Sequence, residues 1–164
     1  MRTPMLFSCS LLLALSTSLS VVGCAGSGPR ACTEIGCGSS VSIELLKRDG
    51  VWGPGAYTVT VVADGETTTC SVTMPLSCDA PPPCGENSSV VIGLSGCALP
   101  VEQQSLSGVE VIGGAPKRIE VQIALDGQGL SEATFTPEYR TSRPNGPECE
   151  PECTQTVEQL VMKL

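Results

Sequence analysis

The chain has 164 residues, no histidine, 3% aromatic residues and a formal net charge of −8 at neutral pH. This acidic balance argues against a nucleic-acid partner, because proteins that bind nucleic acid place lysine and arginine against phosphates. The lack of histidine excludes nucleophilic catalysis by Ser–His–Asp or Cys–His arrangements.

The first residues have the three parts of an export signal. Arg2 supplies a positive start, residues 5–22 are mostly apolar, and small residues lead into Cys24. A retained membrane anchor is the alternative, but a spanning helix needs ~20 strongly apolar residues. Several serines interrupt this run, and no basic cluster follows it. We therefore expect residues 1–23 to be a signal peptide that is removed.

The end of this segment, VVGCAGSG at residues 21–28, resembles the lipobox of bacterial lipoproteins. The resemblance implies cleavage before Cys24 and attachment of a diacylglycerol to its thiol. Two or more acyl chains hold a protein stably on a membrane. Ala25 stands where an aspartate would suggest retention in the inner membrane, so the expected location is the cell envelope, anchored in the outer membrane. The alternative is an ordinary signal-peptidase cut, with Cys24 joining a disulfide.

Residues 24–31 contain Gly26, Ser27, Gly28 and Pro29 and predict a short flexible tether. Residues 32–164 then have the usual size of a single domain. In this part, apolar residues alternate with polar ones in short runs that are separated by Gly, Pro and Asp turns, which is typical of half-buried strands. The runs are 41–45, 57–61, 67–74, 90–94, 109–111, 119–125, 133–140 and 154–162.

Asp64-Gly65 follows a strand pattern and marks a hairpin turn, and Asp126-Gly127 ends the strand over residues 119–125. A helical turn is expected only within residues 99–106. This organisation predicts an all-β fold, an immunoglobulin-like β-sandwich of about seven to nine strands. The Cys–Trp–Cys spacing of true immunoglobulin domains is not evident, so the prediction concerns architecture and not ancestry.

Eight cysteines remain after Cys9 and Cys24 are set aside, and an even number outside the cytoplasm predicts a disulfide framework. Spacing alone does not choose among the possible pairings. Our hypothesis joins Cys32 and Cys37 to Cys149 and Cys153, while Cys70, Cys78, Cys84 and Cys97 pair among themselves. Zinc is less favoured, because the C-x4-C and C-x3-C spacings are looser than those of zinc ribbons. A redox role for Cys149 and Cys153 is less favoured than a structural bridge, because neighbouring glutamates would raise the thiol pKa.

Three stretches resemble a group of uncharacterised bacterial lipoproteins. They are CTEIGC at residues 32–37, GAYTVTV at residues 55–61 and RPNGP at residues 143–147, which precedes Cys149 and Cys153. The resemblance implies a cysteine-rich β-sandwich and an envelope location. The resemblance implies no known activity.

Few residues are candidates for chemistry. Paired carboxylates could hydrolyse glycosides, with Glu44, Glu120 and Glu138 as candidates, although a solvated outer face explains each of them. The lysines Lys47, Lys117 and Lys163 lie near expected strand ends and read as solvated charges.

Two further features have both a binding and a plain interpretation. The acidic residues Glu148, Glu150 and Glu152 either hold calcium weakly or form a solvated charge run, which we favour. Trp52 lies in a glycine-rich loop, where it either stacks on a ligand or covers the edge of the core, which we favour.

The sequence thus predicts a lipid-anchored, non-enzymatic binding or surface-structural module without cofactor or metal. Its expected partners are the membrane, through acyl chains on Cys24, and a protein or glycan at the loops. An envelope hydrolase with paired carboxylates is the alternative.

Overall fold

The computed structural model describes residues 32–48 and 50–162. The predicted signal peptide (residues 1–23), Cys24, the tether (24–31) and Lys163 lie outside the described residues. The described residues belong to one compact unit that begins at Cys32. Within them, no helix is long and apolar enough to cross a membrane.

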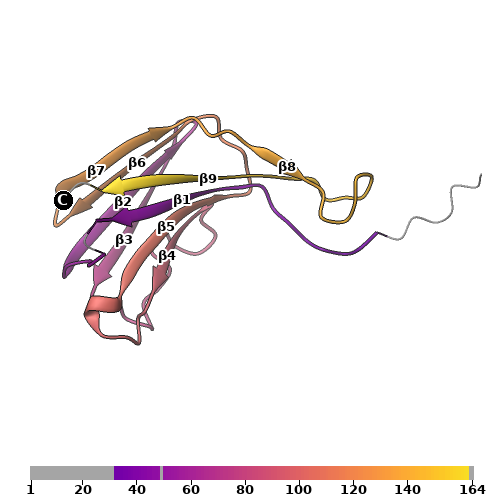
Figure 1. Cartoon of the computed structure of the whole chain (residues 1–164). Helices are drawn as coiled ribbons and strands as arrows, with labels where there is room; N and C mark the ends of the chain where they lie inside the picture. Colours follow the sequence, from indigo (N-terminus) through magenta and orange to yellow (C-terminus); the bar gives the residue numbers. More distant parts are fainter. Residues whose placement is uncertain (1–31, 49, 163–164) are drawn as a thin grey trace, which may run out of the picture. The chain divides into compact units, whose positions relative to one another are not determined.

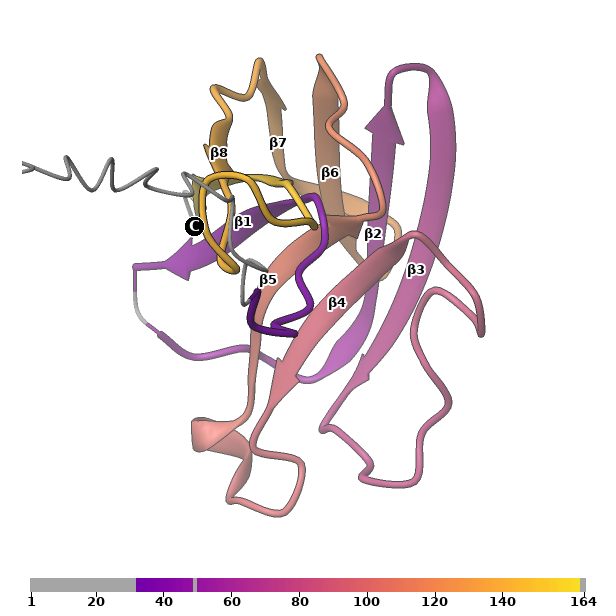
Figure 2. The ribbon, with the colours of Figure 1, turned by 90° about the vertical axis from the view of Figure 1, so that its right-hand side faces the viewer.

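In the described part of the chain, nine strands form two sheets that pack face to face (Figure 1). Figure 2 shows β4, β5 and β1 in front of the sheet that contains β2, β3 and β6. The predicted all-β, immunoglobulin-like sandwich of seven to nine strands is therefore confirmed. The strands are β1 (Ser40–Lys47), β2 (Gly55–Ala63), β3 (Glu66–Met74), β4 (Val90–Ser95), β5 (Ser105–Ile112), β6 (Ile119–Leu125), β7 (Gln128–Phe135), β8 (Arg140–Ser142) and β9 (Cys153–Met162).

The five-stranded sheet has the order β4-β5-β1-β9-β8, and the four-stranded sheet has the order β3-β2-β6-β7. β1 and β9 are parallel, and all the other neighbouring strands are antiparallel. The first and last strands therefore lie side by side in the middle of the chain's larger sheet.

The alternation of side chains explains both sheets. In β6, Ile119, Val121 and Ile123 are buried between the sheets, while Gln122 is exposed on the outer face. Valine, isoleucine and leucine from both sheets build most of the core, and each contributes about 1.5–3 kcal/mol when fully buried. The period-two pattern in the sequence is thus the pattern of core contacts.

The predicted hairpin turn at Asp64-Gly65 is confirmed, and Asp126-Gly127, predicted only to end a strand, forms a second hairpin turn. Asp64 and Gly65 have φ values of 48° and 94°, and Asp126 and Gly127 have φ values of 51° and 79°. Two successive positive φ angles give the turn a twist that matches the flanking strands, and aspartate followed by glycine adopts them at low cost. The turns join β2 to β3 and β6 to β7.

The prediction of one strand over residues 133–140 is wrong. β7 starts at Gln128, directly after the turn, and ends at Phe135, and β8 starts at Arg140 in the other sheet. A shift in register between Ile123 and Ala124 of β6 leaves an extra residue in β7, which breaks the alternation that the prediction followed. Pro137 lies where the chain crosses between the sheets and has no N–H for a ladder.

The crossing is fixed by Tyr139, whose hydroxyl donates a hydrogen bond to the carbonyl of Pro116 at 2.7 Å. Burial raises the pKa of the Tyr139 phenol, and the negative charges of Asp64 and Glu158 raise it further.

The structure also shows the outcome of two other predictions. The helical turn expected within residues 99–106 is a 3-10 helix, η1 (Val101–Gln103), and the short run at 109–111 is part of the longer β5.

All eight cysteines expected to form disulfides do so, and the hypothesis on their pairing is confirmed. Cys32 pairs with Cys149 and Cys37 with Cys153, with Cα atoms 5.9 and 6.0 Å apart. The other bridges are Cys70–Cys84 and Cys78–Cys97, with Cα atoms 4.2 and 5.1 Å apart.

The last two bridges hold the long loop between β3 and β4. Gln104 completes this arrangement, because its side chain is 4% exposed and fully bonded. Its Oε1 accepts a hydrogen bond from Leu76 N at 2.6 Å, and its Nε2 donates to the carbonyl of Leu99 at 3.1 Å. A buried amide with these partners fixes the loop against the start of β5.

Candidate functional site

Residues 32–39 lie along the hairpin formed by residues 140–155, and we call this arrangement the terminal clamp. The clamp lies at one end of the domain, with the β6–β7 turn at the other (Figure 1). Cys32–Cys149 and Cys37–Cys153 join its two halves covalently. The amide of Gln155 adds a hydrogen bond from Nε2 to the carbonyl of Gly38 at 3.1 Å.

Asn145 is the polar centre of the clamp and is only 9% exposed. Its Oδ1 accepts hydrogen bonds from Thr33 Oγ1 at 2.7 Å and from Ile35 N at 2.8 Å. Its Nδ2 donates to the carbonyls of Ile35 at 3.0 Å and Glu150 at 2.6 Å. These four bonds use the donors and acceptors of one amide to join segments that are 110 residues apart in the sequence.

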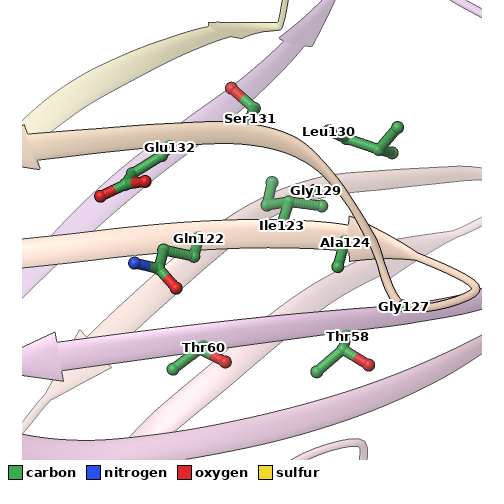
Figure 3. Close-up of a pocket in the computed structure, with 10 residues that line it drawn as sticks. All are labelled: Thr58, Thr60, Gln122, Ile123, Ala124, Gly127, Gly129, Leu130, Ser131 and Glu132. Carbon is green, nitrogen blue, oxygen red and sulfur yellow. The ribbon is translucent and has the colours of Figure 1, made fainter.

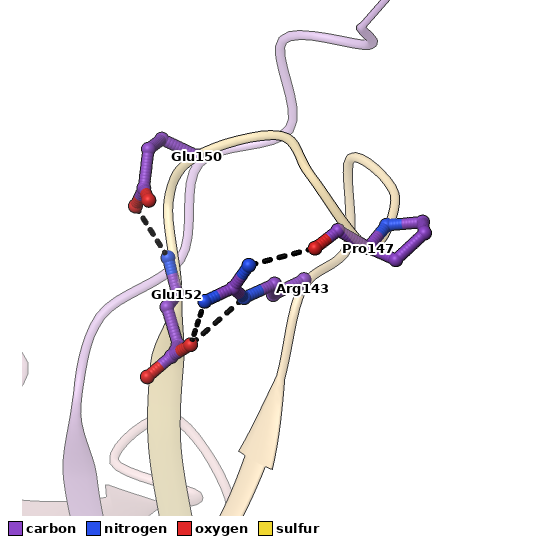
Figure 4. A network of polar contacts seen from close by, with 4 residues as sticks. All are labelled: Arg143, Pro147, Glu150 and Glu152. Carbon is purple, nitrogen blue, oxygen red and sulfur yellow. Dashed lines mark hydrogen bonds and ion pairs between the residues drawn. The ribbon is translucent and has the colours of Figure 1, made fainter.

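A second network shapes the hairpin tip (Figure 4). Arg143 donates from Nε to Glu152 Oε2 at 2.8 Å and from Nη1 to the carbonyl of Pro147 at 2.7 Å. The hydrogen bond with Glu152 and its negative charge raise the pKa of the Arg143 guanidinium. Glu150 accepts a hydrogen bond from the backbone N–H of Glu152 at 3.1 Å.

These contacts bear on the calcium hypothesis for this loop. Glu152 is held by an arginine and Glu150 by a backbone N–H, so both carboxylates already have partners of their own chain. Among the described residues, no three or more His, Cys, Asp or Glu side chains are grouped to hold a metal ion. Cys149 and Cys153 bond to different partners, as the structural-bridge interpretation requires.

Trp52 is 2% exposed and belongs to the core. Its ring meets Tyr57 edge to face, with centroids 5.3 Å apart and an interplanar angle of 72°. This geometry is one that aromatic pairs prefer. The side chain therefore covers the core, as the favoured interpretation predicted, and it is too buried to stack on a ligand.

The three candidate carboxylates do not come together in the structure. Glu44 lies on the outer face of the five-stranded sheet, where its Oε2 accepts a hydrogen bond from Gln159 at 3.0 Å. Glu120 lies on β6 in the other sheet, in an ion pair with Arg118 at 3.0 Å. Glu138 is exposed in the crossing between β7 and β8. The sequence pattern had placed it on a strand, and this prediction is wrong.

The lysine candidates also lie apart from one another. Lys47, at the end of β1, donates its Nζ to the carbonyl of Val51. Lys117 is exposed before β6, where its backbone N–H donates to the carboxylate of Asp64 at 2.9 Å. The third lysine, Lys163, lies outside the described residues.

A groove of 490 Å³ lies on the outer face of the four-stranded sheet (Figure 3). Thr58 and Thr60 of β2 form one side, Gln122 of β6 lies next to them, and Glu132 of β7 forms the other side. The lining is thus rich in hydroxyl and amide groups, with one carboxylate and no basic residue.

Small residues meet at the end of the groove near the β6–β7 turn and leave room there (Figure 3). Ala124 of β6 pairs with Gly129 of β7, and Gly127 lies in the turn that joins the two strands. The bulge in β7 places Leu130 at the groove and increases the local twist of the hairpin. Sequence reasoning missed this groove, because its polar residues have the same alternation as a solvated outer face.

Comparison with known proteins gives no significant match, either to a family profile, to a curated protein or to a solved structure.

Proposed function

We propose that the protein is a lipid-anchored, non-enzymatic binding module of the bacterial cell envelope, located at the outer membrane. The lipobox-like sequence around Cys24 supports the anchor. Four disulfides support an oxidising compartment, since such bridges persist outside the cytoplasm. The terminal clamp supports the anchor further, because the compact unit begins at Cys32 and is covalently fixed there.

The binding surface that we propose is the groove on the four-stranded sheet, and its ligand is a neutral, hydroxyl-rich glycan of the envelope. The observation that carries this proposal is the lining of the groove by the side chains of Thr58, Thr60 and Gln122, with small residues at its end near the β6–β7 turn (Figure 3). Hydroxyls and amides both donate and accept, which suits sugar hydroxyls. The groove reaches Gly127 in the β6–β7 turn, and this turn lies at the opposite end of the domain from the clamp (Figure 1).

The anchor is tested by the intact mass and location of the protein. The mature chain should begin at Cys24 with acyl chains on this residue and should fractionate with membranes. Cys24→Ser should remove the mass of the acyl chains and release the protein or leave its precursor uncut. A Cys24→Ser variant that fractionates like the wild type would contradict the anchor and leave the binding proposal standing.

The groove is tested separately by binding of the immobilised full chain to an array of neutral oligosaccharides. Thr58→Val with Thr60→Val removes two hydroxyls from the groove and keeps β-branched side chains that suit a strand. The matched control, Thr69→Val with Thr73→Val, removes two hydroxyls from exposed positions on the neighbouring strand β3. Glycan binding should fall at least tenfold in the first variant and stay unchanged in the control. Equal loss in both variants, or no binding by the wild type, would contradict the proposed ligand.

A further inference from the structure

The edges of the two sheets are protected to different degrees. An exposed edge strand offers unpaired N–H and C=O groups to any other strand, and proteins usually cover, bend or shorten such edges. At β3, the N–H of Ser71 donates to the carbonyl of Pro83 at 3.0 Å, and Cys70–Cys84 holds this proline-rich loop in place. At β4 and β7, shifts in register bend the edges.

The edge formed by β9 has much less protection. β8 pairs with residues 153–155 of β9 only, and no described strand pairs with residues 156–162 on that side. This stretch contains no proline and no lysine, and its pairing with β1 has no shift in register. Its one charged residue, Glu158, lines a groove of 720 Å³ together with Arg140. In the described part of the chain, the backbone of residues 156–162 therefore has no strand partner on this side.

The direction of the backbone groups follows from two hydrogen bonds. Gly113 N donates to the carbonyl of Ser39 at 3.0 Å, so Ser39 faces β5 and the alternate residue Ser42 faces β9. Ser42 is aligned with Val157, and in a parallel ladder it bonds to the residues on either side of Val157. The bond from Thr154 N to Ser39 Oγ at 3.3 Å agrees with this phase. The N–H and C=O groups of the odd-numbered residues therefore point to the open edge.

The side chains of these odd-numbered residues form a symmetric pattern. Val157 and Val161 are 62% and 49% exposed on the outer face of the sheet, and Gln159 lies midway between them. Leu46 of β1 is aligned with Val161 and is 41% exposed. The sequence Val-x-Gln-x-Val reads the same in both directions along the outer face. An antiparallel copy centred on Gln159 would therefore set each valine opposite a valine.

We propose that two copies of this chain pair through β9 in a symmetric, antiparallel dimer centred on Gln159. Val157 of one copy faces Val161 of the second, and the three odd-numbered residues of each copy form roughly six backbone hydrogen bonds across the two-fold axis. The two five-stranded sheets become one continuous sheet. Exposed valine and leucine side chains of both copies form an apolar strip on its outer face. This inference concerns the assembly of the protein and does not depend on the groove or its ligand.

The crossing between the sheets sets the limit of this pairing. Thr136 and Glu138, which precede β8 in the chain, lie across a groove from Val157 of β9. The segment before β8 therefore diverges from β9. The proposed register uses residues 157–161 only. In this register Met162 of the incoming strand lies opposite Thr156, so the incoming chain has to turn away from the edge at this point.

The test uses the full chain, purified from the fraction in which it occurs. Its protein mass is measured by sedimentation equilibrium, from micromolar to millimolar concentration, with density-matched detergent and a large excess of empty micelles where detergent is needed. The wild type should shift from monomer to dimer as the concentration rises. A wild type that stays monomeric over the whole range overturns the proposal.

Two charge variants test the register. Val157→Lys with Val161→Lys sets lysine opposite lysine at both contacts and should abolish the dimer. Val157→Lys with Val161→Glu differs at one residue, sets lysine opposite glutamate, and should restore it, because directly opposed charges of the same sign destabilise a strand pair and charges of opposite sign stabilise it. Both valines are exposed, so near-ultraviolet circular dichroism should show both variants folded. A dimer that survives the double-lysine change, or one that the lysine–glutamate pair fails to restore, overturns the proposed pairing.

Discussion

Removing one disulfide of the terminal clamp should cost far less than its span in the sequence suggests. Cys32–Cys149 and Cys37–Cys153 join residues that are 117 and 116 positions apart. A bridge that closes a loop of this length alone stabilises a protein by about 5 kcal/mol, because it reduces the entropy of the unfolded chain. When the other bridge is present, however, the second closes only a ring of about 10 residues, which corresponds to about 3 kcal/mol.

The expected result is therefore a coupling between the two bridges. Replacing both cysteines of either bridge by alanine should lower the free energy of unfolding by about 3 kcal/mol. Replacing Cys70 and Cys84, which are 14 positions apart, should cost about the same despite the much shorter span. Replacing both bridges of the clamp should cost about 8 kcal/mol, which exceeds the sum of the two separate effects.

The free energies are measured by urea denaturation of the oxidised proteins, with mass spectrometry to verify that the remaining bridges have formed. Alanine is preferred to serine because Cys153 and Cys70 are fully buried and a hydroxyl there would need a partner. A cost of about 5 kcal/mol for one bridge of the clamp would refute the reasoning. So would strictly additive costs, which are expected if each cysteine paired locally with its neighbour in the sequence.

Three further predictions concern single side chains. Asn145→Ala removes four hydrogen bonds from the clamp and should increase amide hydrogen exchange of Ile35 at least tenfold, as measured by NMR; unchanged exchange would show that the bridges alone hold the segment. Gln104→Ala leaves the buried N–H of Leu76 without its partner and should lower the free energy of unfolding by about 2–3 kcal/mol in urea. Tyr139 should ionise above its ordinary pKa of 10.0 in ultraviolet difference titrations. Its contribution to stability is therefore complete below that value and is lost as pH rises through the higher folded pKa, and the step should be absent from Tyr139→Phe.

Local chemistry in the sequence was sufficient to predict most strands and the hairpin at Asp64-Gly65. The alternation in residues 119–125 is a direct consequence of one buried face, and Asp64-Gly65 meets the backbone requirement of its turn without help from distant residues. The strand over 133–140 failed because a bulge in β7 and the crossing at Pro137 interrupt the alternation. A prediction from alternation requires an unbroken period of two residues, and both the bulge and the crossing break this period.

Contacts between distant segments could not be predicted from local sequence patterns. Asn145 reads as an ordinary turn residue in RPNGP, and its role depends on Ile35, which is 110 positions away. The parallel pairing of β1 with β9 could not be predicted either, because the alternation within a strand does not depend on which strand lies beside it. The groove was missed for a related reason, since Thr58 and Thr60 alternate as they would on any solvated face.

The clamp and the sheet order together explain how this domain would withstand a pull at its amino end. A pull applied at Cys32 is transmitted to β1, which begins at Ser40, and a strand pulled from its end separates from its neighbours one hydrogen bond at a time. Here the pull meets Cys32–Cys149 first and then Cys37–Cys153, so the load passes into the hairpin that leads to β9. Because β9 pairs in parallel with β1, the two strands receive the load at the same end and are not peeled apart. The two bridges ahead of β1 thus lead a pull applied at Cys32 into both β1 and β9.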